Sequence, residues 1–234
     1  LKDRTNFPHN RYFSHQLLTK IKSNLQAKHQ TLIFHNRRGS SPLTICEECG
    51  WQALCPNCYL PMNLHADTYL LSCHLCGHET KVPSSCPNCH HVGIIHKGFG
   101  TKLLEAELKQ LFPNVKTARF DGDNKKDSDL ASLYSAVKSG DIDILIGTQT
   151  LARGLDLPHL ATVGIIQADS GLTLPDFAAE ERTFELLTQV IGRVGRGHLD
   201  LADVIVQTYQ PDHPVIQTAL AADYPAFAEY LLQK

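Results

Sequence analysis

The sequence predicts an α/β fold in which a parallel sheet is interrupted by a cysteine-rich insert. Apolar runs that suit buried strands alternate with amphipathic segments that suit helices. Several of these runs, such as 142–146 and 161–166, are apolar at most positions, which favours strands covered on both faces. All eight cysteines lie between residues 46 and 89. We therefore expect one lobe, formed by 1–45 and 90–234, with a module at 46–89 inserted between two of its strands.

The order of the elements follows from periodicity and from capping residues. Apolar residues recur at helical spacing in 15–28, directly after Ser14 as a plausible N-cap, so this segment is predicted to be a helix. A turn at 98–100 leads into a helix at 101–111. We find no internal repeat. The other predicted strands are 31–35, 92–95, 115–120, 142–146, 161–166 and 203–208, and the other predicted helices are 127–138, one within 175–195, and 214–232.

The cysteines form four Cys-x-x-Cys pairs: Cys46 and Cys49, Cys55 and Cys58, Cys73 and Cys76, and Cys86 and Cys89. A disulfide framework is one alternative, but such frameworks belong to secreted chains, and the polar stretch 1–10 is no export signal. Redox pairs are another alternative, although four of them side by side would be unusual. The two-residue spacing suits a metal knuckle, a short turn whose two cysteines bind the same ion. We therefore predict two structural Zn²⁺ ions, each held by four thiolates from two knuckles.

The spacing between the pairs favours a nested arrangement of the two zinc sites. Fourteen residues separate Cys58 from Cys73, close to the roughly 15–20 typical of zinc ribbons, and the first and last pairs are left to form an outer site. Sequential pairing leaves only 50–54 between two knuckles, and interleaved pairing makes the sites cross. We expect the nearby histidines to act as surface or hydrogen-bonding groups: His65, His74, His78, His90, His91 and His96.

Charge is distributed unevenly along the chain. Residues 1–45 hold eight Lys and Arg and one acid, a net charge of +7, and the remainder carries −9 because the whole chain has −2. A basic segment is compatible with phosphate contact and equally with a solvated helix face. No apolar run approaches the roughly 18 residues of a membrane span, so no membrane partner is expected. Many thiols without an export signal indicate the cytoplasm.

Gly192-Arg193-Val194-Gly195-Arg196 is the clearest candidate for phosphate chemistry. Two arginines three residues apart lie near one face at a helix end. Arginine presents a planar, permanently charged fork, and neighbouring glycines let a phosphate or another backbone approach. The pair suits stabilisation of a transferring phosphoryl group, whereas a basic helix C-terminus favoured by the helix dipole is the alternative.

Two more polar stretches follow predicted strands. The segment 147–158 begins at the carboxyl end of a buried strand, where open α/β sheets bind ligands. Thr148 and the backbone of Gly147 could donate to a phosphate, and Asp156 could accept from a ribose hydroxyl, although a plain polar turn is the alternative. The segment Asn36-Arg37-Arg38-Gly39 also follows a strand.

In this order, the three stretches resemble motifs IV, V and VI in the second RecA-like lobe of superfamily 2 helicases. With the cysteine-rich insert and the Gly98-Phe99-Gly100-Thr101 turn, nearly the whole chain resembles the PriA family of primosomal replication-restart helicases. The resemblance implies an α/β, RecA-like parallel-sheet lobe, the helicase C-terminal lobe, with an inserted two-zinc ribbon module. Lys102 and Ala178 depart from that family's pattern, which usually has an acid or amide at the first position and an arginine at the second.

The resemblance also implies an activity, ATP-dependent 3′→5′ DNA unwinding at stalled forks during primosome assembly. The implied partners are forked and single-stranded DNA, primosome proteins and single-stranded-DNA-binding protein, and the implied state is a monomer. The implied site residues are Arg193, Arg196 and Gln189 for catalysis; Gly154 and Asp156, with both arginines, for nucleotide binding; and Arg37, Arg38, Thr148, Gly100 and Thr101 for DNA binding.

Two motifs that belong to the first lobe of such helicases do not occur in the chain: the Gly-x-x-x-x-Gly-Lys-Ser/Thr phosphate loop and the Asp-Glu-x-His motif. We therefore expect ATP with Mg²⁺ to bind only together with a first lobe, and this chain alone to lack ATPase activity. The alternative is a non-catalytic, zinc-containing module that binds DNA forks or proteins. A zinc hydrolase is disfavoured, because catalytic zinc keeps an open position that eight cysteines would close.

Overall fold

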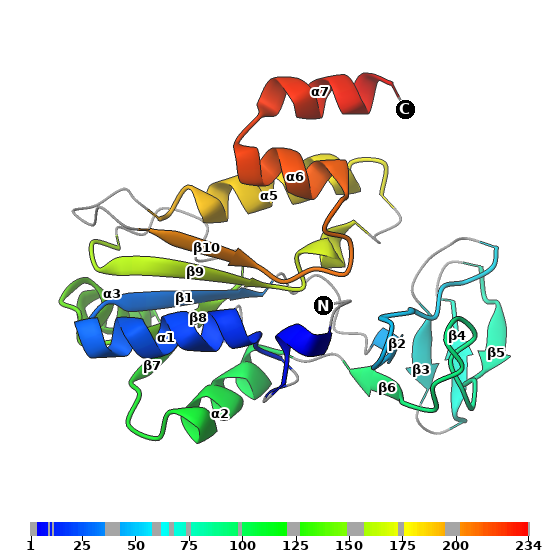
Figure 1. The fold of residues 1–234 in the computed structure, drawn as a ribbon, viewed down its shortest axis with the longest axis horizontal. Coiled ribbons are helices and arrows are strands. Elements are labelled where there is room, and N and C mark those ends of the chain that lie inside the picture. The colour runs from blue at the N-terminus through cyan, green and yellow to red at the C-terminus, as the bar shows by residue number, and fades with distance from the viewer. Residues whose placement is uncertain are drawn as a thin grey trace.

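The structure, a computed structural model, contains two five-stranded sheets that lie side by side (Figure 1). One sheet is parallel and is flanked by helices, and the other is antiparallel and includes the cysteine-rich region. The described residues are 4–8, 10, 12–35, 43–57, 62–65, 68–73, 76–97, 100–120, 127–148, 157–172, 176–194 and 202–233.

The parallel sheet has the strand order β10-β9-β1-β8-β7. Every residue of β1, β8 and β9 is buried, as expected of strands covered on both faces. The predicted fold class, a parallel sheet with helices, is therefore confirmed. The strand bounds are β1 Gln30–His35, β7 Thr117–Phe120, β8 Ile144–Gly147, β9 Leu160–Ile166 and β10 Asp203–Val206.

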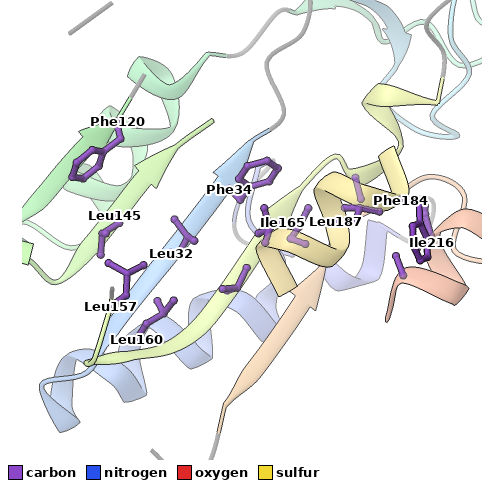
Figure 2. Packing of buried hydrophobic residues seen from close by; sticks show 14 of the residues in the cluster. Leu32, Phe34, Phe120, Leu145, Leu157, Leu160, Ile165, Phe184, Leu187 and Ile216 are labelled. Carbon is purple, nitrogen blue, oxygen red and sulfur yellow. The ribbon is translucent and has the colours of Figure 1, made fainter. Parts of the chain in front are cut away.

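Helices cover both faces of this sheet, so alternate strand residues enter two different cores. Helices α1 (His15–Ala27) and α2 (Thr101–Leu111) pack on one face, where Leu17 and Leu104 belong to one cluster with Ile33. On the other face, Leu32 and Phe34 of β1 pack with residues of the remaining helices, and Figure 2 shows part of that cluster. These helices are α3 Asp127–Lys138, α5 Ala179–Ile191, α6 Pro214–Ala221 and α7 Tyr224–Leu232, and two short 3₁₀ turns are η1 Arg4–Asn6 and η2 Ala168–Gly171.

Helix α1 begins where the sequence predicts. The Ser14 side chain accepts a hydrogen bond from the Leu17 backbone N–H at 3.3 Å, which satisfies one of the donors at the helix start. On its buried face, the Asn24 side-chain amide donates to the hydroxyls of Thr31 (2.9 Å) and Thr162 (2.8 Å), on β1 and β9. These bonds fix α1 against two central strands.

The predicted helix at 214–232 is wrong as a single element, because it divides into α6 and α7. Ala222 has a left-handed backbone with φ of 53°, and the Asp223 side chain accepts from the Ala226 N–H at 3.0 Å as the N-cap of α7. Pro225 lies in the first turn of α7, where its missing N–H costs nothing, whereas inside a continuous helix it would remove a hydrogen bond.

The antiparallel sheet has the order β5-β4-β3-β2-β6. Its strands are short, and their bounds are β2 Leu43–Cys46, β3 Asn63–His65, β4 Leu70–Ser72, β5 Glu79–Lys81 and β6 Ile94–Lys97. A small apolar cluster that includes Ala53, Met62 and Leu71 packs beside two of the buried cysteines. The buried cysteines and this small apolar cluster together form the interior of the module.

Strand β6 corrects a second expectation. The sequence predicts that 92–95 resumes the parallel sheet, but Ile94–Lys97 pairs with β2, with Ile45 opposite Ile95. The antiparallel sheet thus extends from Leu43 to Lys97, beyond the predicted insert 46–89 at both ends. The expected division of the chain into two domains stays a prediction.

No helix within the described residues combines the length and the apolar character that crossing a membrane requires.

Candidate metal centres and ligand-binding edges

The first candidate metal centre joins the two ends of the antiparallel module. The sulfurs of Cys46, Cys49, Cys86 and Cys89 all lie within 4.8 Å of one another. The Cys46–Cys89 and Cys49–Cys86 sulfur distances are both 3.6 Å. Tetrahedral zinc with bonds of about 2.3 Å places its sulfurs about 3.8 Å apart, whereas a disulfide needs about 2.05 Å. The four sulfurs therefore fit a metal ion and not disulfides.

The second candidate centre contains Cys55, Cys73 and Cys76, with 3.5 Å between the sulfurs of Cys55 and Cys76. Its expected fourth member, Cys58, lies outside the described residues. The first and last pairs meet in one cluster, and the described cysteines of the two middle pairs meet in the other, which is the grouping of nested pairing.

Three of the knuckles share one backbone pattern. The first cysteine donates its N–H to the carbonyl five residues later, and the residue four positions later donates back to that cysteine's carbonyl. That fourth residue adopts a left-handed backbone, with φ between 59° and 73°. The positions with this φ are Gly50, Gly77 and His90. Glycine adopts such a φ without a steric cost, so two of the three knuckles use the residue that the turn favours.

The electrostatics of the first cluster favour a bound cation. Burial opposes ionisation of Cys49, but hydrogen bonds from the Asn88 side chain and the Trp51 backbone outweigh it and lower the pKa to about 6. A backbone hydrogen bond from His91 works to lower the pKa of Cys89, but desolvation and the neighbouring sulfurs raise it to about 12. The cluster thus accepts one negative charge readily and resists a further one. A divalent cation would relieve that repulsion.

The knuckle of the first metal centre lies against a residue that follows β10 of the parallel sheet. A Cβ at Gly50 would lie 2.2 Å from Cδ1 and 2.5 Å from Cε1 of Tyr209, so the knuckle backbone rests directly on this ring. Tyr209 follows β10, and its backbone N–H donates to Asp169 Oδ1 at 2.8 Å. The hydroxyl of Thr208 donates to the same carboxylate, which is buried. A hydrogen-bonded corner at the ends of β9 and β10 therefore supports the first centre.

The described residues among those expected to contact DNA lie at the carboxyl edge of the parallel sheet or at the start of α2. Thr148 directly follows β8, is partly exposed, and donates its backbone N–H to the Phe120 carbonyl at 3.2 Å. Gly100 is the N-cap of α2 and offers no side chain. Thr101 is only 1% exposed, so a contact at this turn would involve the Gly100 backbone rather than the Thr101 side chain.

Arg193, the described arginine among the residues expected to contact nucleotide phosphates, lies at the opposite edge. Helix α5 follows the carboxyl end of β9 and runs back across the sheet to the start of β10 (Figure 1). Its last turn is tight, since the Arg193 N–H donates to Val190 rather than continuing the helix. Arg193 is partly buried there, and Gln189 is exposed. Arg193 therefore does not belong to a ligand site at the carboxyl ends of the strands.

The segment 147–158 connects these two edges. It leaves β8 at the carboxyl edge with Thr148, and its last described residues, Leu157 and Pro158, come just before β9 begins at Leu160. Several other expected site residues lie outside the described residues: Arg37, Arg38, Gly154, Asp156 and Arg196.

Sequence reasoning missed the residues around the metal centres. The Asn88 side chain donates to Cys49 Sγ at 3.5 Å, and the Asn57 side chain donates to Cys76 Sγ at 3.9 Å. The signal was present in the sequence, because both asparagines occur in the same tetrapeptide, Cys-Pro-Asn-Cys. The expectation of no internal repeat is wrong for this module.

Comparison with known proteins identifies the class. Residues 88–198 match the family of the helicase conserved C-terminal domain. The match runs from β6 and α2 through β7, β8 and β9 to α5, and it includes Thr148 and Arg193 but not α1, β1 or β10. Three of the five strands of the parallel sheet, with α2, α3 and α5, therefore belong to a region that matches a helicase C-terminal domain. Among solved structures, the C-terminal domain of the DEAD-box protein Dbp5 is 15% identical with a TM-score of 0.42, covering 90% of this chain and 78% of that one; the assignment does not depend on this similarity.

Individual relatives define the family more closely. The replication restart protein PriA of Haemophilus influenzae is 41% identical over 221 residues, which are 94% of this chain and 30% of that protein. PriA of Bacillus subtilis is also 41% identical, over 93% of this chain and 27% of that protein. The chain belongs to the PriA family, and it spans less than a third of the length of these relatives.

Proposed function

We propose that this chain is the second motor lobe of an ATP-dependent 3′→5′ DNA helicase that acts at stalled replication forks in primosome assembly. The observation that carries the proposal is the 41% identity to replication restart proteins over 94% of the chain. The match to the helicase C-terminal domain supports the motor assignment independently.

In the proposed mechanism, a first lobe binds most of ATP and Mg²⁺, and this lobe adds positive charge from the end of α5. Arg193, together with Arg196, would contact the phosphates and stabilise charge on the transferring phosphoryl group. The tight last turn of α5 fixes the backbone position from which the Arg193 guanidinium would reach the phosphates. Gln189, exposed one turn earlier, would face the same nucleotide, as would Gly154 and Asp156.

DNA would contact the opposite edge of the lobe. Thr148 and the Gly100 backbone, with Arg37 and Arg38, would bind phosphates rather than bases, so binding would be insensitive to sequence and sensitive to salt. The described ends of 147–158 lie at these two edges, so closure on ATP would be transmitted along the chain to the DNA contacts.

The two cysteine clusters would each hold one structural Zn²⁺. Cys46, Cys49, Cys86 and Cys89 would hold the first ion, and Cys55, Cys58, Cys73 and Cys76 the second. Four thiolates close a tetrahedral site, so each ion would supply folding stability to a module with little apolar core. The proposed partners are forked and single-stranded DNA, primosome proteins and single-stranded-DNA-binding protein; the protein would act as a monomer in the cytoplasm.

The test is Arg193→Ala in the complete protein, which supplies the first lobe. Loss of an arginine that stabilises the phosphoryl group should lower kcat for ATP hydrolysis by about 10³-fold or more. Binding of single-stranded DNA, measured by fluorescence anisotropy, should be retained. The matched control is Arg182→Ala, which removes a charged arginine from the same helix, where it pairs with Asp176 on the surface. Unchanged hydrolysis in Arg193→Ala, or an equal loss in Arg182→Ala, would refute the assignment.

A non-catalytic module that binds forks or proteins is the second candidate. The antiparallel sheet lies beside the motor lobe and not within it, which is the placement that a binding surface needs (Figure 1). The same experiment separates the candidates, because a binding module predicts no effect of Arg193→Ala on turnover.

A further inference from the structure

The cysteine-rich module is built from two similar halves. Each half contains a Cys-x-x-Cys-Gly knuckle followed by a Cys-Pro-Asn-Cys knuckle. The glycines that close the first type, Gly50 and Gly77, have nearly identical φ values of 73° and 71°. The halves exchange partners, because each cluster combines the Cys-x-x-Cys-Gly knuckle of one half with the Cys-Pro-Asn-Cys knuckle of the other.

Both Cys-Pro-Asn-Cys knuckles use their asparagine in the same way. The Asn88 amide donates to Cys49, 39 residues away in the chain, and the Asn57 amide donates to Cys76, 19 residues away. Each amide therefore reaches across its cluster to a sulfur on the other knuckle. Two independent occurrences at equivalent positions make a chance surface contact a poor explanation.

The two sulfurs that accept these bonds have something else in common. Cys49 is partly exposed and Cys76 is exposed, whereas the first cysteines of the same knuckles, Cys46 and Cys73, are buried. Each asparagine thus contacts the more accessible sulfur of the facing knuckle. A hydrogen bond to a thiolate withdraws charge from the sulfur and fixes its orientation, as groups around a metal's ligands generally do.

We propose that Asn57 and Asn88 are positioning residues of the two metal centres, each holding the solvent-accessible thiolate of the opposite knuckle on its ion. The proposal rests on the proposed function of the cysteine clusters as zinc sites. Asparagine suits this role because its side chain donates without carrying charge, whereas an aspartate of the same shape would repel a thiolate.

The experiment measures zinc release from the purified chain into a chromogenic chelator in excess. The variants are Asn88→Leu and Asn57→Leu, which keep the approximate side-chain volume and remove the donor. Asn114→Leu, at an exposed turn after α2, is the matched control for an added surface leucine. Asn88→Asp keeps the side-chain shape, so it tests the same contact if Asn88→Leu fails to fold. Far-ultraviolet circular dichroism checks the fold of every variant.

Wild-type chain should hold two zinc ions, and Asn88→Leu should accelerate the release of one of them by roughly tenfold, at the lower end of the range for groups that support metal ligands. Asn57→Leu should accelerate release of the other ion by a smaller factor, since its contact is longer, and Asn88→Asp should release at least as fast as Asn88→Leu. If folded Asn88→Leu and Asn88→Asp hold two zinc ions and release them at the wild-type rate, the positioning role is overturned. Fewer than two ions in the wild-type chain would instead overturn the zinc assignment itself.

Discussion

At Gly50 the backbone of the first metal knuckle lies against the ring of Tyr209, and replacing this glycine by alanine separates two physical effects. Alanine at φ of 73° should cost about 1–2 kcal/mol, because the left-handed region brings Cβ close to the following carbonyl. The new Cβ would also lie 2.2 Å from Tyr209 Cδ1 and 3.2 Å from Cγ, near the rigid root of the ring. Such overpacking typically adds about 1–3 kcal/mol. We therefore expect Gly50→Ala to lower the free energy of unfolding of the module by about 2–5 kcal/mol.

Gly77→Ala is the matched control. Gly77 closes the equivalent knuckle with φ of 71°, but no atom lies within 4 Å of its would-be Cβ. Gly77→Ala should therefore show the conformational cost alone, about 1–2 kcal/mol. The difference between the two variants measures the contact between the knuckle and Tyr209.

The assay is urea unfolding in the presence of zinc, followed by fluorescence. The chain has one tryptophan, Trp51, next to Gly50, so the signal reports the module directly. Truncating the ring should remove the clash, so in a Tyr209→Ala background Gly50→Ala should cost no more than Gly77→Ala does. Equal costs for the two glycine variants in the wild-type background, or no rescue by Tyr209→Ala, would refute the docking of the knuckle on this ring.

Three further predictions concern stability. Asn24→Ala leaves two buried threonine hydroxyls without their amide donor and should lower the free energy of unfolding by about 1–3 kcal/mol in urea titrations. An effect below about 0.5 kcal/mol, half of one such bond, would contradict the role of this link. Burial works to raise the pKa of Glu105, but hydrogen bonds from Lys109 and Thr117 outweigh it and hold the pKa below its usual value of 4.5. The ionised carboxylate therefore stabilises the fold fully above pH 4.5, and this stabilisation is lost as the pH falls through the lowered pKa. Glu105→Gln should therefore reduce stability by about 1 kcal/mol near pH 7, with a difference that shrinks towards pH 4; a constant difference would argue against the ionic contribution. Removing metal with a chelator and mild denaturant should unfold the module and change Trp51 fluorescence while the far-ultraviolet signal of the helices persists, and an unchanged Trp51 signal after verified metal loss would contradict a structural role for the ions.

The elements that depend on local sequence were predictable. Helix α1 begins after Ser14, and α2 and α3 have the predicted bounds, because their caps or turns and apolar spacing are encoded within each segment. The division between α6 and α7 was also encoded locally, in Asp223 and Pro225, but a continuous apolar pattern concealed it.

The errors in the fold come from non-local pairing. An apolar run such as 92–95 does not specify its neighbouring strand, and Ile94–Lys97 joins β2 because the two knuckles that flank these strands meet in one cluster. The same cluster therefore sets the boundary of the antiparallel sheet, which extends beyond the cysteines on both sides.

The candidate sites show the same contrast. Spacing predicted which cysteines group together, since nested pairing gives the inner site a separation close to that of zinc ribbons and leaves the first and last pairs to form the outer site. The contact of Gly50 with Tyr209 joins residues far apart in the chain and leaves no pattern in the sequence. Thr148 and Arg193 lie at opposite edges because α5 runs antiparallel to the strands. This direction is known only once α5 is recognised as the crossover between the parallel strands β9 and β10.

The most direct test of the central claim, that this lobe supplies only part of an ATP site, is ATP hydrolysis by the purified chain with and without forked DNA. We predict no turnover in either case, and turnover that depends on Arg193 once a first lobe is supplied. DNA-stimulated hydrolysis by the chain alone, abolished by Arg193→Ala and so not due to a contaminant, would contradict the claim and require a complete phosphate-binding site within these 234 residues.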